Sequence, residues 1–147
     1  VDALKEMTAP PEDSAVDQNT FTGIFSDPYV DDQFVSVKLI LSQYTGGAHG
    51  NTLVSGQTFD RTTGKRLTLS DVLPLIGKTV SELSEVASAD LKAKLGDTFA
   101  FPEGADTNPE NFSSFVVTDS AVTFIFQEYQ VAAYAFGPQE VSIPRSK

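Results

Sequence analysis

The sequence predicts an α+β fold: a mostly antiparallel sheet built from hairpins, with one long amphipathic helix packed on it. Residues 34–42 alternate between apolar and other side chains, which is typical of a half-buried strand. Short connections that contain glycine separate several runs of this kind, and such connections favour antiparallel hairpins. Residues 80–95 form the one long stretch with apolar residues at helical spacing, which predicts the helix.

The chain of 147 residues is long enough for one domain with a sizeable core. We assign residues 29–147 to a single domain, because nothing in them repeats or marks a boundary. Residues 1–28 are interpreted as an acidic N-terminal arm plus a short first strand at residues 21–25, after which residues 26–28 turn the chain. Because the chain starts with valine, we interpret it as a mature or trimmed fragment. No apolar run approaches the roughly 20 residues that span a bilayer.

A glycine-rich turn is predicted at residues 44–51, between two strand-like runs. The run before it, residues 34–42, has valine or leucine at its odd positions and a mixture of side chains at its even positions. Adjacent Gly46 and Gly47 permit a positive φ, or a close backbone approach that a Cβ would prevent. The turn would present His49, the single histidine, at its tip. The alternative is an ordinary connection in which His49 only hydrogen-bonds the nearby backbone.

Shorter elements are expected after this turn. A turn at Gly64 would lead into a short strand through residues 67–69, followed by a brief helical turn at residues 71–73. A second hairpin would pair residues 115–117 with residues 122–126, and residues 141–143 would form a final strand.

The long helix has recognisable signals at both ends. Thr79 and Glu82 fit a capping box, in which each side chain accepts a hydrogen bond from the other residue's backbone N–H. Gly96 stands where a helix commonly stops. We therefore predict a helix from Val80 to Leu95 that packs against the sheet and carries no chemistry of its own.

No group of residues forms a pattern that we assign to catalysis. His49 has no serine in a nucleophile-elbow motif to act on, and one histidine without any cysteine is too little for a typical zinc site. The oxygen-rich loop 97–111 lacks the spacing of an EF-hand. Asp31 and Asp32 are better explained as solvated charge than as a glycosidase pair. The sequence predicts that the chain is not an enzyme and has no catalytic residues, metal site or cofactor.

The chain is acidic, with a formal net charge of −10. Residues 1–32 hold eight acidic side chains and one lysine, so most of the excess charge lies there. Such a charge repels phosphate groups, and no nucleic acid partner is expected. It would attract a basic protein and speed the encounter. The alternative is a solvated acidic segment that keeps the chain soluble.

Residues 129–137 form an aromatic stretch near the end of the chain. Tyr134 and Phe136, followed by Gly137, are candidates for a binding loop, because half-exposed aromatic rings offer flat contact area at a low entropic cost. Core packing is an equal alternative for these two rings. Tyr129 is expected to fill the core.

Several blocks of the sequence resemble one family. They are residues 44–49 (YTGGAH), residues 59–71 (FDRTTGKRLTLSD) and residues 124–137 (FIFQEYQVAAYAFG), closed by VSIP at residues 141–144. In this order they are similar to the extracytoplasmic domain of the lysozyme-sensing anti-sigma factor RsiV and its relatives. The same domain also precedes some cell-wall polysaccharide deacetylase domains. One departure is Gly50, which stands where many relatives carry proline.

The resemblance implies a non-catalytic binding or sensing domain of a bacterial envelope protein, located outside the cytoplasmic membrane in the periplasm or at the cell surface. Its partner would be lysozyme or another basic wall-active protein. The alternative is a peptidoglycan-binding accessory domain of a wall-modifying enzyme such as a polysaccharide deacetylase. The candidate binding residues lie in the two glycine-bearing loops of the motif: Tyr44, Thr45, Gly46, Gly47, His49, Tyr134, Phe136 and Gly137.

Overall fold

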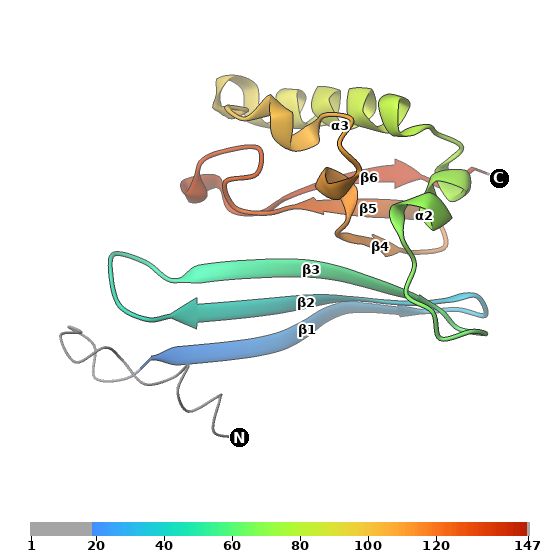
Figure 1. Cartoon of the computed structure of the whole chain (residues 1–147), viewed down its shortest axis with the longest axis horizontal. Coiled ribbons are helices and arrows are strands. Elements are labelled where there is room, and N and C mark those ends of the chain that lie inside the picture. Colours follow the sequence, from blue (N-terminus) through green and yellow to red (C-terminus); the bar gives the residue numbers. More distant parts are fainter. Residues whose placement is uncertain (1–18, 147) are drawn as a thin grey trace.

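The computed structural model describes residues 19–146, and the fold is α+β, as predicted. The first sheet contains β1 (Thr20–Val30), β2 (Phe34–Tyr44) and β3 (Asn51–Asp60) in that order. The second sheet contains β4 (Phe115–Val117), β5 (Ala121–Phe126) and β6 (Gln139–Pro144). All neighbouring strands are antiparallel. Figure 1 shows three layers, with helix α3 (Val80–Leu95) on the second sheet and the first sheet beneath it.

The long helix begins and ends as its sequence predicts. The backbone N–H of Thr79 donates to Glu82 Oε2 at 2.8 Å, and the N–H of Glu82 donates to Thr79 Oγ1 at 3.3 Å, which completes the capping box. Gly96 ends the helix with a φ of 56°. Three short 3-10 turns, η1 (Gly96–Thr98), η2 (Pro102–Ala105) and η3 (Pro109–Phe112), then carry the chain to β4.

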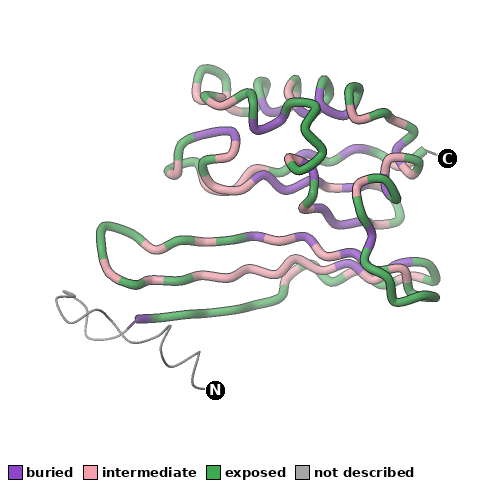
Figure 2. The backbone as a smooth tube through the Cα atoms, viewed as in Figure 1, coloured by how far each residue is buried: buried purple, intermediate pink, exposed green. Residues whose placement is uncertain are grey.

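The hydrophobic core lies between the second sheet and the helices. Buried residues are concentrated there in Figure 2, whereas much of the first sheet is intermediate or exposed. Along β4, β5 and β6 every second side chain faces the helices, and the apolar side chains at these positions are buried. The side chains of this core that are at most 1% exposed include Val72, Leu83, Ala87, Leu91, Phe112, Val117, Val122, Phe124, Phe126, Val131 and Val141.

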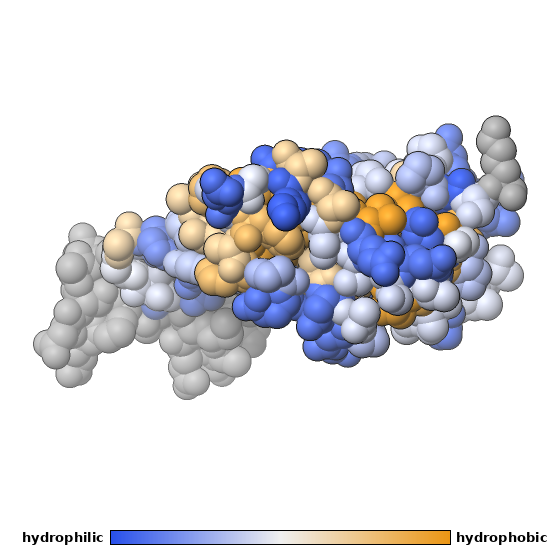
Figure 3. All heavy atoms as spheres, turned by 90° about the horizontal axis from the view of Figure 1, so that it is seen from above, coloured by the Kyte–Doolittle hydropathy of each residue, from blue (hydrophilic) through white to orange (hydrophobic). Residues whose placement is uncertain are grey.

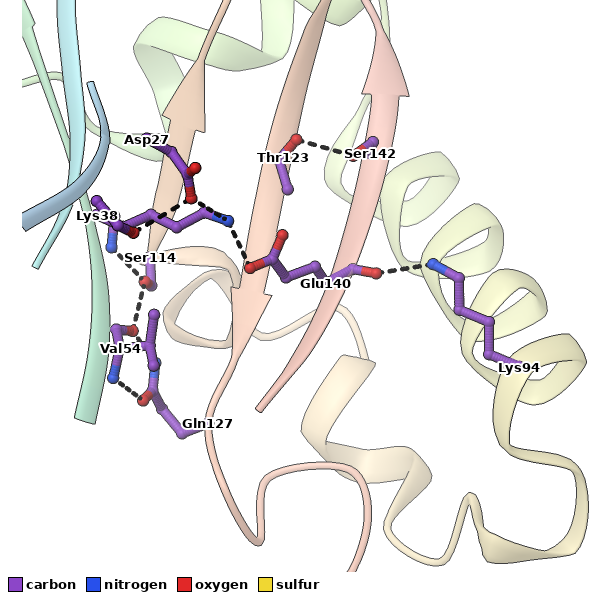
Figure 4. A network of polar contacts seen from close by, with 11 residues as sticks. Asp27, Lys38, Val54, Lys94, Ser114, Thr123, Gln127, Glu140 and Ser142 are labelled. Atoms are coloured by element: carbon purple, nitrogen blue, oxygen red, sulfur yellow. Dashed lines mark hydrogen bonds and ion pairs between the residues drawn. The ribbon is translucent and has the colours of Figure 1, made fainter. Parts of the chain in front are cut away.

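The two sheets are joined by polar side chains that bond to strand backbone. Gln127 binds both backbone groups of Val54, accepting from its N–H at 3.0 Å and donating to its carbonyl at 2.6 Å, as a neighbouring strand would. Ser114 Oγ accepts from the N–H of Gly56 at 2.9 Å (Figure 4). Ser36 Oγ accepts from the N–H of Val117 at 3.1 Å. These contacts satisfy strand backbone that the sheets themselves leave unpaired.

A second connection between the sheets is ionic. Lys38 on β2 binds Glu140 on β6 at 2.7 Å and Asp27 on β1 at 3.2 Å (Figure 4). Burial lowers the pKa of Lys38, but the hydrogen bonds to Glu140 and Asp27 outweigh it, so that the net shift of this pKa is upward. On the helix side, Lys94 Nζ donates to the backbone carbonyl of Glu140 at 2.8 Å. A continuous series of polar contacts, from Lys38 through Glu140 to Lys94, therefore connects all three layers.

The face of the first sheet that carries mixed side chains packs against the second sheet, and its more apolar face points away from the second sheet. Ser36 and Lys38, at the even positions of β2, make the contacts described above. The odd positions, valine and leucine, lie on the opposite face, where the antiparallel register places the exposed Phe25 opposite Leu39. Seen from the helix side, hydrophobic side chains also reach the surface between hydrophilic ones (Figure 3).

Two expectations about the strands of the fold are wrong. Residues 26–28 do not turn the chain; they form an irregularity in the register within β1, which continues to Val30. Asp27 has a φ of 50° there, and its carboxylate is held by Lys38. The strand of the expected arm is therefore the edge of the first sheet, and residues 1–18 of that arm lie outside the described residues.

The second error concerns the strand expected at residues 67–69, whereas the helical turn expected at residues 71–73 is part of a longer helix. Instead of a strand, the structure has a single bridge between Phe59 and Arg66, followed by helix α2 (Leu69–Ile76). Thr68 caps this helix with Asp71, and Pro74 lies inside it. The helix continues past the proline because Val72 and Ile76 are both buried in the core. Among the described residues, no helix is both long enough and apolar enough to cross a membrane.

We predict that Gly56→Ala strongly destabilises the fold. A Cβ on Gly56 would collide with the Phe115 backbone, including Phe115 N at 2.7 Å, and backbone cannot rotate away. The expected loss is about 3 kcal/mol in the free energy of unfolding, measured by urea denaturation. Gly23→Ala is the matched control on an edge strand, because its Cβ would meet only the movable end of Leu41 at 3.2 Å. Equal stability of the two variants would contradict this view of the contact between the sheets.

Candidate functional site

The glycine turn joins β2 to β3 at one end of the first sheet, as predicted. Gly46 and Gly47 have φ angles of 98° and 101°, which side chains with a Cβ rarely adopt. Tyr44 donates its hydroxyl hydrogen to the Gly47 carbonyl at 2.9 Å, which closes the turn on itself. His49 is exposed at the tip. We call residues 44–50 the glycine turn.

The second candidate loop, residues 127–138, joins β5 to β6. It contains a short 3-10 turn, η4 (Tyr134–Phe136), and Gly137 follows with a φ of 63°. Tyr129 in the same loop has a φ of 64°, an uncommon conformation for any residue with a side chain and especially for an aromatic one. Its ring is 57% exposed, so the core does not impose this backbone conformation. We call residues 127–138 the aromatic loop.

The two loops meet, although they are far apart in the sequence. The Tyr134 hydroxyl donates to the Gly50 carbonyl at 2.9 Å. The rings of His49 and Tyr134 stack with centroids 3.9 Å apart and planes at 23°, and the Tyr129 ring lies 5.8 Å from that of Tyr134. Phe136, in the same turn as Tyr134, is 46% exposed. Figure 1 shows both loops at the same end of the molecule. We call His49, Tyr129, Tyr134 and Phe136 the aromatic surface.

The structure places every predicted binding residue in one of these two loops. Thr45 and Gly46 lie in the glycine turn, and Phe136 and Gly137 lie in the aromatic loop. Tyr129 was not among the predicted binding residues, because its ring was expected to fill the core. Nothing in the sequence indicates the positive φ that brings this ring to the surface.

The surroundings of His49 do not resemble a catalytic centre. Its Nδ1 lies 2.9 Å from the Gly50 carbonyl, and its ring stacks on Tyr134. Because a carbonyl only accepts hydrogen bonds, this contact requires hydrogen on Nδ1. This agrees with the alternative in which the histidine bonds nearby backbone. Residues 19–146 contain no cluster of three or more His, Cys, Asp or Glu side chains that could hold a metal ion.

The aromatic surface has almost no charge of its own. Residues 43–52 contain no acidic or basic side chain apart from His49, and residues 127–139 contain one, Glu128. The site therefore offers flat rings and neutral polar groups.

The sequence belongs to a known family. The family model described as "Protein of unknown function (DUF3298)" matches residues 73–146, and this chain is a member of that family. Two solved structures of DUF3298 proteins share its fold, each at 21% sequence identity. One, from Bacteroides fragilis, has a TM-score of 0.68 and covers 91% of this chain and 54% of that chain. The other, from Pseudomonas aeruginosa, has a TM-score of 0.53 and covers 88% and 61%.

The chain is also similar to parts of two named bacterial proteins. It is 30% identical over 117 residues to the peptidoglycan-N-acetylmuramic acid deacetylase PdaC of Bacillus subtilis, covering 78% of this chain and 25% of that protein. It is 25% identical over 111 residues to the immunogenic protein MPT64 of Mycobacterium tuberculosis, covering 76% and 49%. The chain thus spans between a quarter and about half of these relatives.

We predict that Tyr129→Gly does not lower stability. Glycine adopts a φ of 64° without strain, whereas a tyrosine there costs on the order of 1 kcal/mol. More than half of the residue is exposed, so the buried area lost is mainly its contact with Tyr134. The melting temperature should stay the same or rise, as measured by circular dichroism. A clear drop would mean that the Tyr129 ring is needed for folding, and the backbone conformation could no longer be attributed to the site.

Proposed function

We propose that this chain is a non-catalytic binding domain of a bacterial envelope protein, located outside the cytoplasmic membrane. The observation that carries the proposal is the meeting of the two loops in one exposed aromatic surface. Exposed aromatic rings held in fixed positions are typical of recognition sites, because little side-chain entropy is lost on binding. The positive φ of Tyr129 supports the same view, since strained backbone is concentrated at functional sites.

The extracytoplasmic location is supported by the relatives. PdaC is named for an activity on peptidoglycan, a polymer outside the membrane, and this chain matches a quarter of that protein. A domain of this size attached to a wall-modifying enzyme would serve it as an accessory, by holding the enzyme near its polymer.

Two classes of partner fit such a domain. A sensing role of the RsiV type would require lysozyme or another basic wall-active protein, and the net charge of −10 would speed its approach. An accessory role would require peptidoglycan itself.

The two roles differ in a direct binding experiment. Immobilised chain should retain either a C-type lysozyme or purified peptidoglycan fragments, compared by surface plasmon resonance at low and high salt. Steered association of a basic protein should slow at high salt. Retention of neither partner at tens of micromolar would contradict the proposed binding function.

Variants that test the role of charge must spare carboxylates with structural contacts. Asp31 is unsuitable, because its Oδ1 accepts from the backbone N–H groups of Gln33 and Phe34 at 2.7 and 2.6 Å. These bonds, with the one to Phe34 as the main cause, hold the pKa of Asp31 below its ordinary value. Asp27 is committed to Lys38. Asp32 is the better choice, because its side chain is fully exposed and its ion-pair partner among the described residues is the exposed Arg61, whose Nη1 lies 3.9 Å from Asp32 Oδ1. An exposed pair of this kind contributes little stability, so Asp32→Asn should mainly reduce the association rate of a basic partner.

A further inference from the structure

We propose that the aromatic surface binds the neutral sugar rings of a wall glycan, and specifically N-acetylated pyranose units. This inference rests on the proposed function, since it names the ligand of the same surface. Three properties of the surface support it: how the rings are held, what charge surrounds them, and which polar groups flank them.

The first property is that the rings are fixed before any ligand arrives. Tyr134 is held by its hydrogen bond to Gly50 and by stacking on His49. The Tyr129 ring lies against that of Tyr134, with centroids 5.8 Å apart. Pyranose rings present a flat face of C–H groups, whose partial positive charge matches the negative face of an aromatic ring. A rigid, exposed set of rings is therefore suited to successive sugars.

The second property is the lack of charge. A basic protein would gain most from carboxylates placed at the contact itself. Glu128 is the one carboxylate in residues 43–52 and 127–139. The next in the sequence, Glu140, is committed to Lys38. Residues 103–111, whose Gly104 and Asn111 carbonyls accept from Gln130, also carry Glu103, Asp106 and Glu110. Because the two loops themselves carry a single carboxylate, a ligand on their rings meets mainly neutral groups, which favours a neutral ligand over a cationic one.

The third property is the type of polar group beside the rings. Gln43 and Asn51 are opposite each other at the base of the glycine turn, and Thr45 lies within it; all three are exposed and neutral. Amide and hydroxyl groups both donate and accept hydrogen bonds, as sugar hydroxyl and N-acetyl groups require. The relative PdaC is named for an activity on N-acetylmuramic acid, an N-acetylated pyranose, which is consistent with such a ligand.

Isothermal titration calorimetry with a β-1,4-linked tetramer of N-acetylglucosamine tests the inference. We expect binding whose Kd is nearly the same at low and high salt, because no ions are exchanged. Tyr129→Gly and Phe136→Ala should each weaken it by about tenfold. Tyr134→Phe keeps the ring but removes the bond to Gly50, and it should weaken binding less than Phe136→Ala. Phe25→Ala is the matched control, because Phe25 is an exposed ring on β1, 74% accessible, and should leave Kd unchanged.

The outcomes separate this inference from the proposed function. If the tetramer does not bind but lysozyme does, and Phe136→Ala abolishes lysozyme binding, the sugar ligand is wrong and the binding function stands. If neither binds the folded chain, both are wrong. If the tetramer binds but only Phe25→Ala weakens it, the ligand class is right and its site is not the aromatic surface, which also overturns the inference.

Discussion

The close approach of β3 and β4 at Gly56 is the constraint on which the rest of the structure depends. No side chain separates the two backbones there, so Ser114 and Gln127 can bond directly to β3. Because β3 leads out of the glycine turn and Gln127 opens the aromatic loop, this contact also sets the distance between the loops. The position of the aromatic surface is thus a consequence of how the sheets meet.

The layers are held together by different kinds of contact, and this difference follows from the same arrangement. The second sheet and the helices hold most of the buried apolar side chains, whereas the first sheet is joined to them largely by hydrogen bonds and by Lys38. Hydrogen bonds impose geometry more strictly than apolar contacts do, because they are directional. A sheet attached in this way is well suited to hold the glycine turn in one position. The glycine turn then holds Tyr134 of the aromatic loop through both its ring, which stacks on His49, and its hydroxyl, which donates to Gly50.

Local features of this fold could be predicted from the sequence, and tertiary ones could not. The capping box at Thr79 and the paired glycines at Gly46 act within a few residues, and both were predicted correctly. The bulge at Asp27 was mistaken for a turn, since its positive φ is stabilised by Lys38, eleven positions later. The resemblance pointed to both candidate loops. Their contact through Tyr134, and the exposure of Tyr129, depend on packing between distant segments that no local pattern encodes.

The central claim is that the glycine turn and the aromatic loop act as one binding surface. It is tested most directly by titrating the ¹⁵N-labelled chain with soluble peptidoglycan fragments and following the backbone amide shifts by NMR. The account predicts that residues 44–50 and 127–138 shift together and saturate at the same fragment concentration. Shifts confined to one loop, or to the face of the first sheet that carries Phe25, would contradict it.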